Sequence, residues 1–211
     1  MRTDHLIDVL AADAVPRRNF GWHFVWMLAC GFAIASVTFL LLVGVRHDIL
    51  VAVHSPRFLF KFVVTLALAV IASAATRRAG DPSGNLYPWM KAVACVPIPL
   101  AGAVVLELVT VPSGEWVHRL IGHDAWRCMM LIPFLSAGPL GCLLLALRQG
   151  APTQPGFAGA IAGLCASGIA ATLYAANCTD DSPLFIATWF SLAILIVTAA
   201  GYLAGRRLLI W

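Results

Sequence analysis

The stretch WHFVWMLACGFAIASVTFLLLVGV, residues 22–45, decides the fold class because it contains no Asp, Glu, Lys or Arg. A helix needs roughly 20 consecutive apolar residues to cross a hydrocarbon core of about 30 Å. A backbone inside lipid must also satisfy its hydrogen bonds internally, which an unbroken helix does. The stretch therefore predicts a transmembrane helix.

The rest of the chain has the same character. Apolar residues make up 61% of its 211 residues and charged residues 11%, whereas soluble domains carry about a quarter charged residues. Such a chain cannot cover a water-facing surface, and it is too apolar to be disordered. The pattern predicts an all-α, polytopic membrane protein, a bundle of six transmembrane helices with both termini cytoplasmic. The six predicted spans are 22–45, 58–75, 92–111, 129–147, 157–177 and 184–205.

The Lys and Arg residues that flank these spans predict the orientation, because cytoplasmic loops carry an excess of positive charge. A cytoplasmic N-terminus places more of these residues inside than outside. Inside are Arg2, Arg17, Arg18, Arg77, Arg78, Lys91, Arg148, Arg206 and Arg207, and outside are Arg46, Arg57, Lys61, Arg119 and Arg127. The predicted organisation is a cytoplasmic N-terminal segment (1–21), a six-helix transmembrane domain (22–205) and a cytoplasmic C-terminal tail (206–211).

The N-terminal segment is the longest continuous part predicted on the cytoplasmic side. Thr3 can cap a short helix, and Asp4 interacts favourably with the helix dipole. Leu6, Ile7 and Leu10 then form an apolar stripe. Such an amphipathic helix can dock in the groove of a partner protein, or it can lie on the membrane surface. Its acidic residues favour the membrane surface less, because anionic leaflets attract basic residues.

Two of the six cysteines, Cys128 and Cys178, fall at the outer ends of spans four and five. A disulfide needs Cα atoms roughly 4.4–6.8 Å apart, which antiparallel neighbouring helices can provide. Cys128 and Cys178 are therefore the one pair expected to share a wet, oxidising edge. We expect a disulfide or a redox-responsive pair there, and the alternative is two unrelated interfacial cysteines.

The outer loops also contain side chains that bind zinc and related metals. Their spacing matches no standard cluster, and the sequence has no Cys-x-x-Cys motif, so the alternative is solvated loop residues. The candidate ligands are His118, His123, Asp124, Asp180 and Asp181, with His47 and His54 in the other outer loop.

Glu107 is the one carboxylate inside a predicted span. Intramembrane charges are functional candidates because they are costly to bury. Lys61 lies at a similar depth in span two, so an ion pair between Glu107 and Lys61 is the structural interpretation. The functional interpretation makes Glu107 a proton or cation site near an outer cavity.

Several classes of protein are disfavoured by motifs that the sequence lacks. It contains no Walker loop, dinucleotide fingerprint, His-Glu-x-x-His motif or nucleophile elbow, and we do not expect an enzyme. A membrane thiol oxidoreductase is weakly supported without a Cys-x-x-Cys motif. A small transporter or channel subunit that uses Glu107 is the main alternative to a regulatory protein.

Two stretches carry a family resemblance. The first is Thr3-Asp4-His5-Leu6-Ile7, with Leu10-Ala11 and Pro16, and the second is Asn177-Cys178-Thr179-Asp180-Asp181-Ser182-Pro183, followed by Trp189. With the six spans and the cysteine pair, the chain resembles, over essentially its whole length, the NrsF family. Members of that family are membrane anti-sigma factors that restrain extracytoplasmic-function sigma factors in proteobacteria.

The resemblance implies that the chain holds a sigma factor at the bacterial inner membrane through its cytoplasmic parts. It also implies release of that partner when Cys128 and Cys178 respond to metal or oxidative stress. The residues expected to bind the sigma factor are Thr3, Asp4, Leu6, Ile7 and Leu10. We expect the lipid bilayer as a second partner, no direct contact with nucleic acid, and no cofactor beyond a transient metal ion at the periplasmic face.

Overall fold

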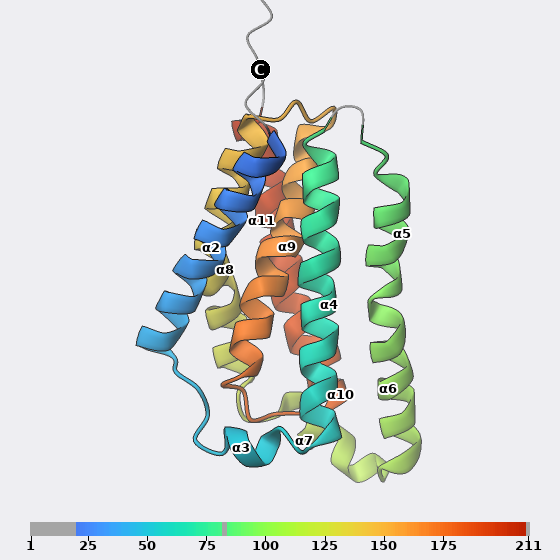
Figure 1. The fold of residues 1–211 in the computed structure, drawn as a ribbon. Helices are drawn as coiled ribbons and strands as arrows, with labels where there is room; N and C mark the ends of the chain where they lie inside the picture. The colour runs from blue at the N-terminus through green and yellow to red at the C-terminus, as the bar shows by residue number, and fades with distance from the viewer. Residues whose placement is uncertain (1–19, 82–83, 210–211) are drawn as a thin grey trace, which may run out of the picture.

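The structure, a computed structural model, describes residues 20–81 and 84–209 (Figure 1). All regular secondary structure in these two stretches is helical. Proline occupies the start of several helices, where its missing N–H removes no hydrogen bond. The elements are α2 (Phe20–Leu42), α3 (Ile49–Ala52), α4 (Pro56–Ala79), α5 (Tyr87–Cys95), α6 (Pro97–Thr110), η1 (Ser113–Glu115), α7 (Trp116–Ile121), α8 (Ala125–Arg148), α9 (Pro155–Ala175), α10 (Pro183–Phe185), η2 (Ile186–Phe190) and α11 (Ser191–Leu208).

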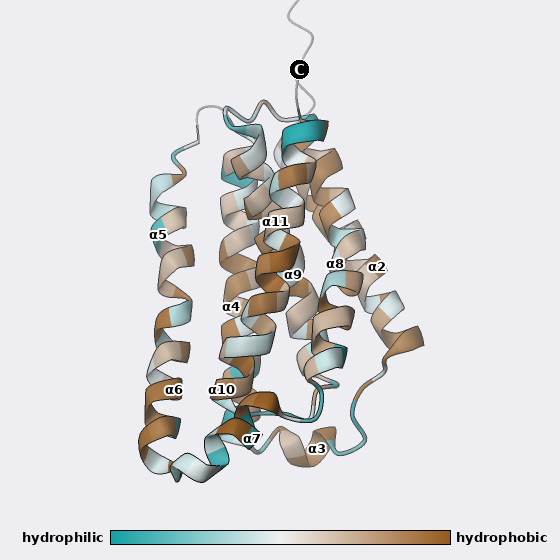
Figure 2. Ribbon diagram, turned by 180° about the vertical axis from the view of Figure 1, so that it is seen from behind, coloured by the Kyte–Doolittle hydropathy of each residue, from teal (hydrophilic) through white to brown (hydrophobic). Residues whose placement is uncertain are grey.

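Six helical units are long and apolar enough to cross a membrane, which confirms the predicted six-helix bundle. Figure 2 shows apolar colours along these units and the strongest polar colours near the two ends of the bundle. The third unit is divided at Val96, directly before Pro97, because proline cannot continue a regular helix. The units are Phe20–Leu42, Pro56–Ala79, Tyr87–Thr110, Ser113–Arg148, Pro155–Ala175 and Pro183–Leu208.

The central helix is α9, which packs against α11, α4 and α8 (Figure 1). Its contact with α11 depends on glycine. A Cβ added at Gly159 would lie 2.3 Å from the carbonyl oxygen of Gly201, and one at Gly163 would lie 2.7 Å from that of Val197. Small residues let the two backbones approach closely where no hydrophobic effect drives helices together. The α9–α11 pair therefore forms the closely packed centre of the bundle.

The outer helices differ in how much of their surface packs against the rest of the bundle. A stripe of Phe24, Gly31, Ala35 and Phe39 on α2 is buried, and α2 packs against α8. The third span, α5 and α6, stands beside α4 at the edge of the bundle (Figure 1). Only 11% of its apolar window is buried by the rest of the chain, compared with 72% for α9. Most of the apolar surface of the third span is therefore left uncovered by the other described residues.

The bundle has two distinct ends (Figure 1). At the terminal end, α2 begins and α11 ends. At the loop end lie the connections 43–55, 111–124 and 176–182, which include α3, η1 and α7. All the predicted cysteine and metal-site residues belong to the loop end or to the helices that begin there.

Candidate functional site

The connection between α9 and α10, residues 176–182, forms the centre of the candidate site. Its fold is fixed first by the backbone, because the N–H of Cys178 donates a hydrogen bond to the carbonyl oxygen of Tyr174 at 3.0 Å. The Cys178 thiol in turn donates to the backbone oxygen of Asp180 at 3.6 Å. These bonds turn the connection back over the end of α9 and bury the Cys178 side chain completely.

Cys128 reaches the same place from the first turn of α8. Its N–H donates to the carbonyl oxygen of Asp124 at 2.9 Å, and its side chain is also fully buried. The carboxylate of Asp124 accepts a hydrogen bond from the hydroxyl of Thr179 at 3.0 Å, so Asp124 is bonded to both cysteine-bearing segments. Cys128 and Cys178 belong to one apolar cluster. The structure thus brings together the two cysteines that the sequence singled out.

The environment of the two thiols differs from the sequence prediction. A wet edge was expected, but Cys128 and Cys178 are each 0% exposed and both are free thiols. Aromatic rings of Tyr174, Phe185 and Phe190 contribute to the cluster around them. Burial raises the pKa of the Cys178 thiol to about 11, although the nearby Lys61 charge and the hydrogen bond to Asp180 lower it. Both thiols are therefore covered in this state, and the raised pKa keeps the Cys178 thiol protonated at neutral pH.

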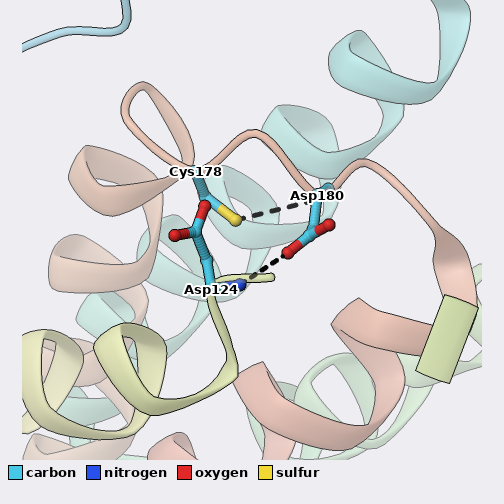
Figure 3. A group of neighbouring side chains, drawn as sticks. All are labelled: Asp124, Cys178 and Asp180. Atoms are coloured by element: carbon cyan, nitrogen blue, oxygen red, sulfur yellow. Dashed lines mark hydrogen bonds between the residues drawn. The ribbon is translucent and has the colours of Figure 1, made fainter. Parts of the chain in front are cut away.

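Asp124, Cys178 and Asp180 form a group whose carboxylate oxygens and sulfur lie within 4.8 Å of one another (Figure 3). One oxygen of Asp180 accepts hydrogen bonds from the backbone N–H groups of His123, at 2.8 Å, and Asp124, at 2.9 Å. The bonds hold the start of α8 against the connection 176–182. One sulfur and two carboxylates also suit a borderline divalent cation, once the thiol has lost its proton.

The other predicted metal ligands are only partly gathered there. The His123 ring lies 3.7 Å from Asp180, measured between Nδ1 and Oδ1, and the His118 ring lies beside the His123 ring. Asp181 points elsewhere and pairs with Lys61. His47 and His54 belong to the connection 43–55, where the ring of His54 hydrogen-bonds to a backbone oxygen in the same segment.

Lys61 is the charge that anchors this connection to the bundle. Its side chain is 0% exposed, and its ammonium group donates to the Asp181 carboxylate at 2.6 Å and to the Cys178 carbonyl oxygen at 2.9 Å. Arg46 also pairs with Asp181 at 3.3 Å. The Phe58 ring lies 5.4 Å from the ammonium nitrogen of Lys61, within the range of a cation–π interaction. A buried lysine needs such partners because an unpaired charge is costly to bury.

The ion pair expected between Lys61 and Glu107 is wrong. Glu107 instead accepts hydrogen bonds from the Ser182 hydroxyl at 2.8 Å and from the Leu184 N–H at 3.1 Å, and it pairs with Arg119 at 3.2 Å. The two residues have different partners because the connection 176–182 supplies Asp181 to α4, whereas α7 supplies Arg119 to α6. Glu107 thereby satisfies the first N–H group of α10, that of Leu184.

Sequence reasoning missed four residues of this network: Arg46, Arg119, Thr179 and Ser182. Thr179 and Ser182 lie within the distinctive stretch 177–183, which offered a signal. Arg46 and Arg119 were counted only as flanking charges. Arg46 also pairs with Asp48 and Arg119 with Glu115, but no local pattern indicated their further partners Asp181 and Glu107.

Comparison with known proteins decides the family. The model of the NrsF family, described as negative regulator of sigma F, matches residues 10–211. The chain belongs to the NrsF family. Over its whole length and theirs, it is 35% identical to the anti-sigma-F factor NrsF of Caulobacter vibrioides (strain NA1000 / CB15N) and 32% identical to the probable anti-sigma-F factor NrsF of Azospira oryzae (strain ATCC BAA-33 / DSM 13638 / PS). No solved structure matches.

Membership of the NrsF family confirms the resemblance found in the sequence and implies a regulatory role. The network of Lys61, Glu107, Asp124 and the connection 176–182 is thus the candidate site of an NrsF-family protein. The residues predicted to bind a partner, Thr3, Asp4, Leu6, Ile7 and Leu10, lie outside the described residues.

Proposed function

We propose that this chain is an anti-sigma factor that holds an extracytoplasmic-function sigma factor at the bacterial inner membrane. Its N-terminal segment lies in the cytoplasm and binds the sigma factor through Leu6, Ile7 and Leu10, with Thr3 and Asp4 at the start of the helix. Metal or oxidative stress acts on Cys128 and Cys178 at the periplasmic face and releases the sigma factor. The family and the names of its two relatives support the partner class.

The observation that carries the sensing part is the shared burial of two free thiols, one from the first turn of α8 and one from the connection between α9 and α10. Both are in one cluster at the loop end of the bundle, and α2 begins at the opposite end (Figure 1). A chemical change at the thiols must therefore act through the helices to reach the N-terminal segment.

Two kinds of stress chemistry fit the pair. Oxidation to a disulfide removes one proton and one electron from each thiol, and a two-electron oxidant accepts the electrons. The S–S bond of about 2.0 Å would then tie the first turn of α8 to the connection 176–182. A divalent metal would instead displace a proton from Cys178 and draw on Asp124 and Asp180, which lie within reach of its sulfur.

Either change would strain the bonds that hold Lys61 of α4 to Asp181 and to Cys178. A change of about 3 kcal/mol in the relative stability of two bundle states would alter sigma-factor affinity roughly 150-fold. Ordinary packing rearrangements can supply a difference of that size.

A pull-down of the sigma factor from membranes tests the proposal. Three proteins are compared: the wild type, Cys128→Ser/Cys178→Ser, and the matched control Cys142→Ser/Cys165→Ser, whose cysteines are buried within α8 and α9. We expect all three to retain the sigma factor at rest. Oxidant or cadmium should release it from the wild type and the control only. Absence of any sigma factor would remove the anti-sigma assignment, and equal release from all three would remove the sensing role.

The transporter alternative loses its main support. Glu107 is bonded to Ser182, Leu184 and Arg119, so its carboxylate performs a structural task. Flux that depends on Glu107 in proteoliposomes would restore that alternative.

A further inference from the structure

A cavity of about 830 Å³ lies at the terminal end of the bundle, among α2, α4, the start of α5 and the α8–α9 connection. Phe20, Phe24 and Trp89 contribute aromatic surface to its lining, and Arg77 and Arg78 contribute two guanidinium groups. Ligand-binding cavities commonly measure roughly 300–1,000 Å³. This cavity is therefore large enough to receive several apolar side chains together with acidic groups.

The charges of the lining are available to an acidic ligand. Arg77 and Arg78 are exposed, and neither forms an ion pair with another residue of the described ranges 20–81 and 84–209. Arg77 lies against α2, since a Cβ added at Gly21 would be 2.8 Å from its Nη2 atom. Asp81 also lines the cavity, so the lining carries two positive charges and one negative charge.

We infer that this cavity binds the chain's own N-terminal segment, residues 1–19, and that the sigma factor competes with the cavity for that segment. The inference rests on the proposed function, in which the same segment binds the sigma factor. Docked, the segment would be withheld from the sigma factor. Undocked, it would be free to bind.

The first support is where the segment ends. Residue 19 is followed directly by Phe20, which is itself a lining residue. The apolar stripe, which ends at Leu10, is therefore tethered to the wall of the cavity by residues 11–19 alone. Short tethers of this kind give effective concentrations in the millimolar range, so even weak complementarity suffices for docking.

The second support is chemical complementarity. Asp4 and Asp8 are four residues apart, which places them on one face of a helix, beside the apolar stripe of Leu6, Ile7 and Leu10. The cavity offers aromatic surface for the stripe and two guanidinium groups for the carboxylates. Carboxylates bind guanidinium groups with good geometry and strength.

The third support is the position of α4. This helix carries Lys61, which holds Asp181 and Cys178 at the loop end, and also Arg77 and Arg78, which line the cavity. Lys61 and Arg77 are separated by about 24 Å at 1.5 Å per residue. A shift of α4 produced at the thiols would thus change the cavity that receives the N-terminal segment.

Photocrosslinking in the full-length protein tests the inference. The photoreactive residue p-benzoylphenylalanine replaces Leu10, and the matched control places it at Ala12, which falls on the face of the predicted helix opposite the apolar stripe. The protein is held in nanodiscs, and crosslinked peptides are identified by mass spectrometry. We expect the probe at position 10 to crosslink to peptides that contain Phe24 or Trp89, the probe at position 12 to do so much less, and added sigma factor to abolish the crosslinks.

The second test exchanges the charges of the cavity and of the N-terminal segment and measures the affinity for the sigma factor. Arg77→Glu/Arg78→Glu should weaken docking, and Asp4→Arg/Asp8→Arg in the same chain should restore it. If the segment is docked about 80% of the time, loss of docking raises apparent sigma-factor affinity about fivefold, because the competent fraction rises. Arg148→Glu changes a charge at the same end without touching the cavity, and we expect it to leave affinity unchanged.

The outcomes separate the two proposals. Crosslinks to the cavity without any sigma-factor binding would refute the proposed function alone. Sigma-factor binding through the segment, with no cavity crosslinks and an unchanged affinity in Arg77→Glu/Arg78→Glu, would refute this inference alone. Crosslinks that vanish in nanodiscs of anionic lipid but persist in zwitterionic lipid would show that lipid headgroups occupy the cavity in native membranes, which also overturns it.

Discussion

The ammonium group of Lys61 donates a hydrogen bond to the carbonyl oxygen of Cys178 at 2.9 Å, so a fully buried charge holds the backbone of one of the two thiol residues. The same ammonium group binds Asp181 at 2.6 Å. Helix α4 is thereby fixed to the connection 176–182 at a point inside the bundle, and any movement of that connection must break these bonds or carry α4 with it.

Replacing Lys61 should destabilise the fold. In Lys61→Met, Asp181 keeps only Arg46, and the Cys178 carbonyl loses its charged donor. Removing one partner of a buried pair typically costs about 3–5 kcal/mol. We expect a clear drop in the midpoint of thermal unfolding in detergent. Lys91→Met removes a lysine that stacks on Tyr87 at the edge of the bundle and should have little effect. Equal midpoints for the two variants would contradict the anchoring role.

Replacing Glu107 should lower the stability of the protein because it removes hydrogen bonds that the carboxylate accepts. Glu107→Ala leaves the buried N–H of Leu184 without its acceptor, and an unsatisfied buried donor costs about 1–3 kcal/mol. Glu107→Gln retains an oxygen acceptor and should destabilise the protein less. Thermal unfolding of the two variants checks this order, and equal destabilisation by both would show that the carboxylate charge, which both lack, is the dominant contribution.

The reactivity of Cys178 should depend steeply on pH. With its pKa raised to about 11 by burial, only on the order of one thiol in ten thousand is ionised at pH 7. Because the thiolate is the reactive form, alkylation of a variant that retains only Cys178 should accelerate about tenfold per pH unit between pH 7 and 10. The unfolded protein serves as the control, since its thiol titrates near its ordinary value. A rate that levels off by pH 9 would contradict the raised pKa.

The close approach of α9 and α11 predicts a strict requirement for glycine. Gly159→Ala would place a Cβ 2.3 Å from the Gly201 oxygen, so the helices must separate and lose packing. The matched control is Gly102→Ala, where an added Cβ meets nothing within 4 Å. We expect the midpoint of thermal unfolding to fall for Gly159→Ala and to hold or rise for Gly102→Ala, because alanine favours helices over glycine.

The parts of this structure that hydropathy determines could be predicted from sequence. The six spans follow from apolar runs and turn residues, and the break before Pro97 follows from the chemistry of proline. The partners of Lys61 and Glu107 could not be predicted, because they depend on how the connection 176–182 folds over the bundle. Depth along the membrane was a good guide to which residues share an end. It was a poor guide to exposure, since Cys128 and Cys178 lie at the rim in sequence yet are covered by the aromatic cluster.

The third span is only weakly attached to the rest of the bundle, so its position can respond to the surrounding bilayer. In a bilayer, a helix of which the chain buries so little would adjust its tilt to the thickness of the hydrocarbon layer, at a cost of only fractions of a kcal/mol per Å. Glu107 joins that helix to Ser182 and Leu184, beside the thiol-bearing connection. A change in bilayer thickness would therefore act on the connection 176–182, which contains Cys178 and packs in the same cluster as Cys128.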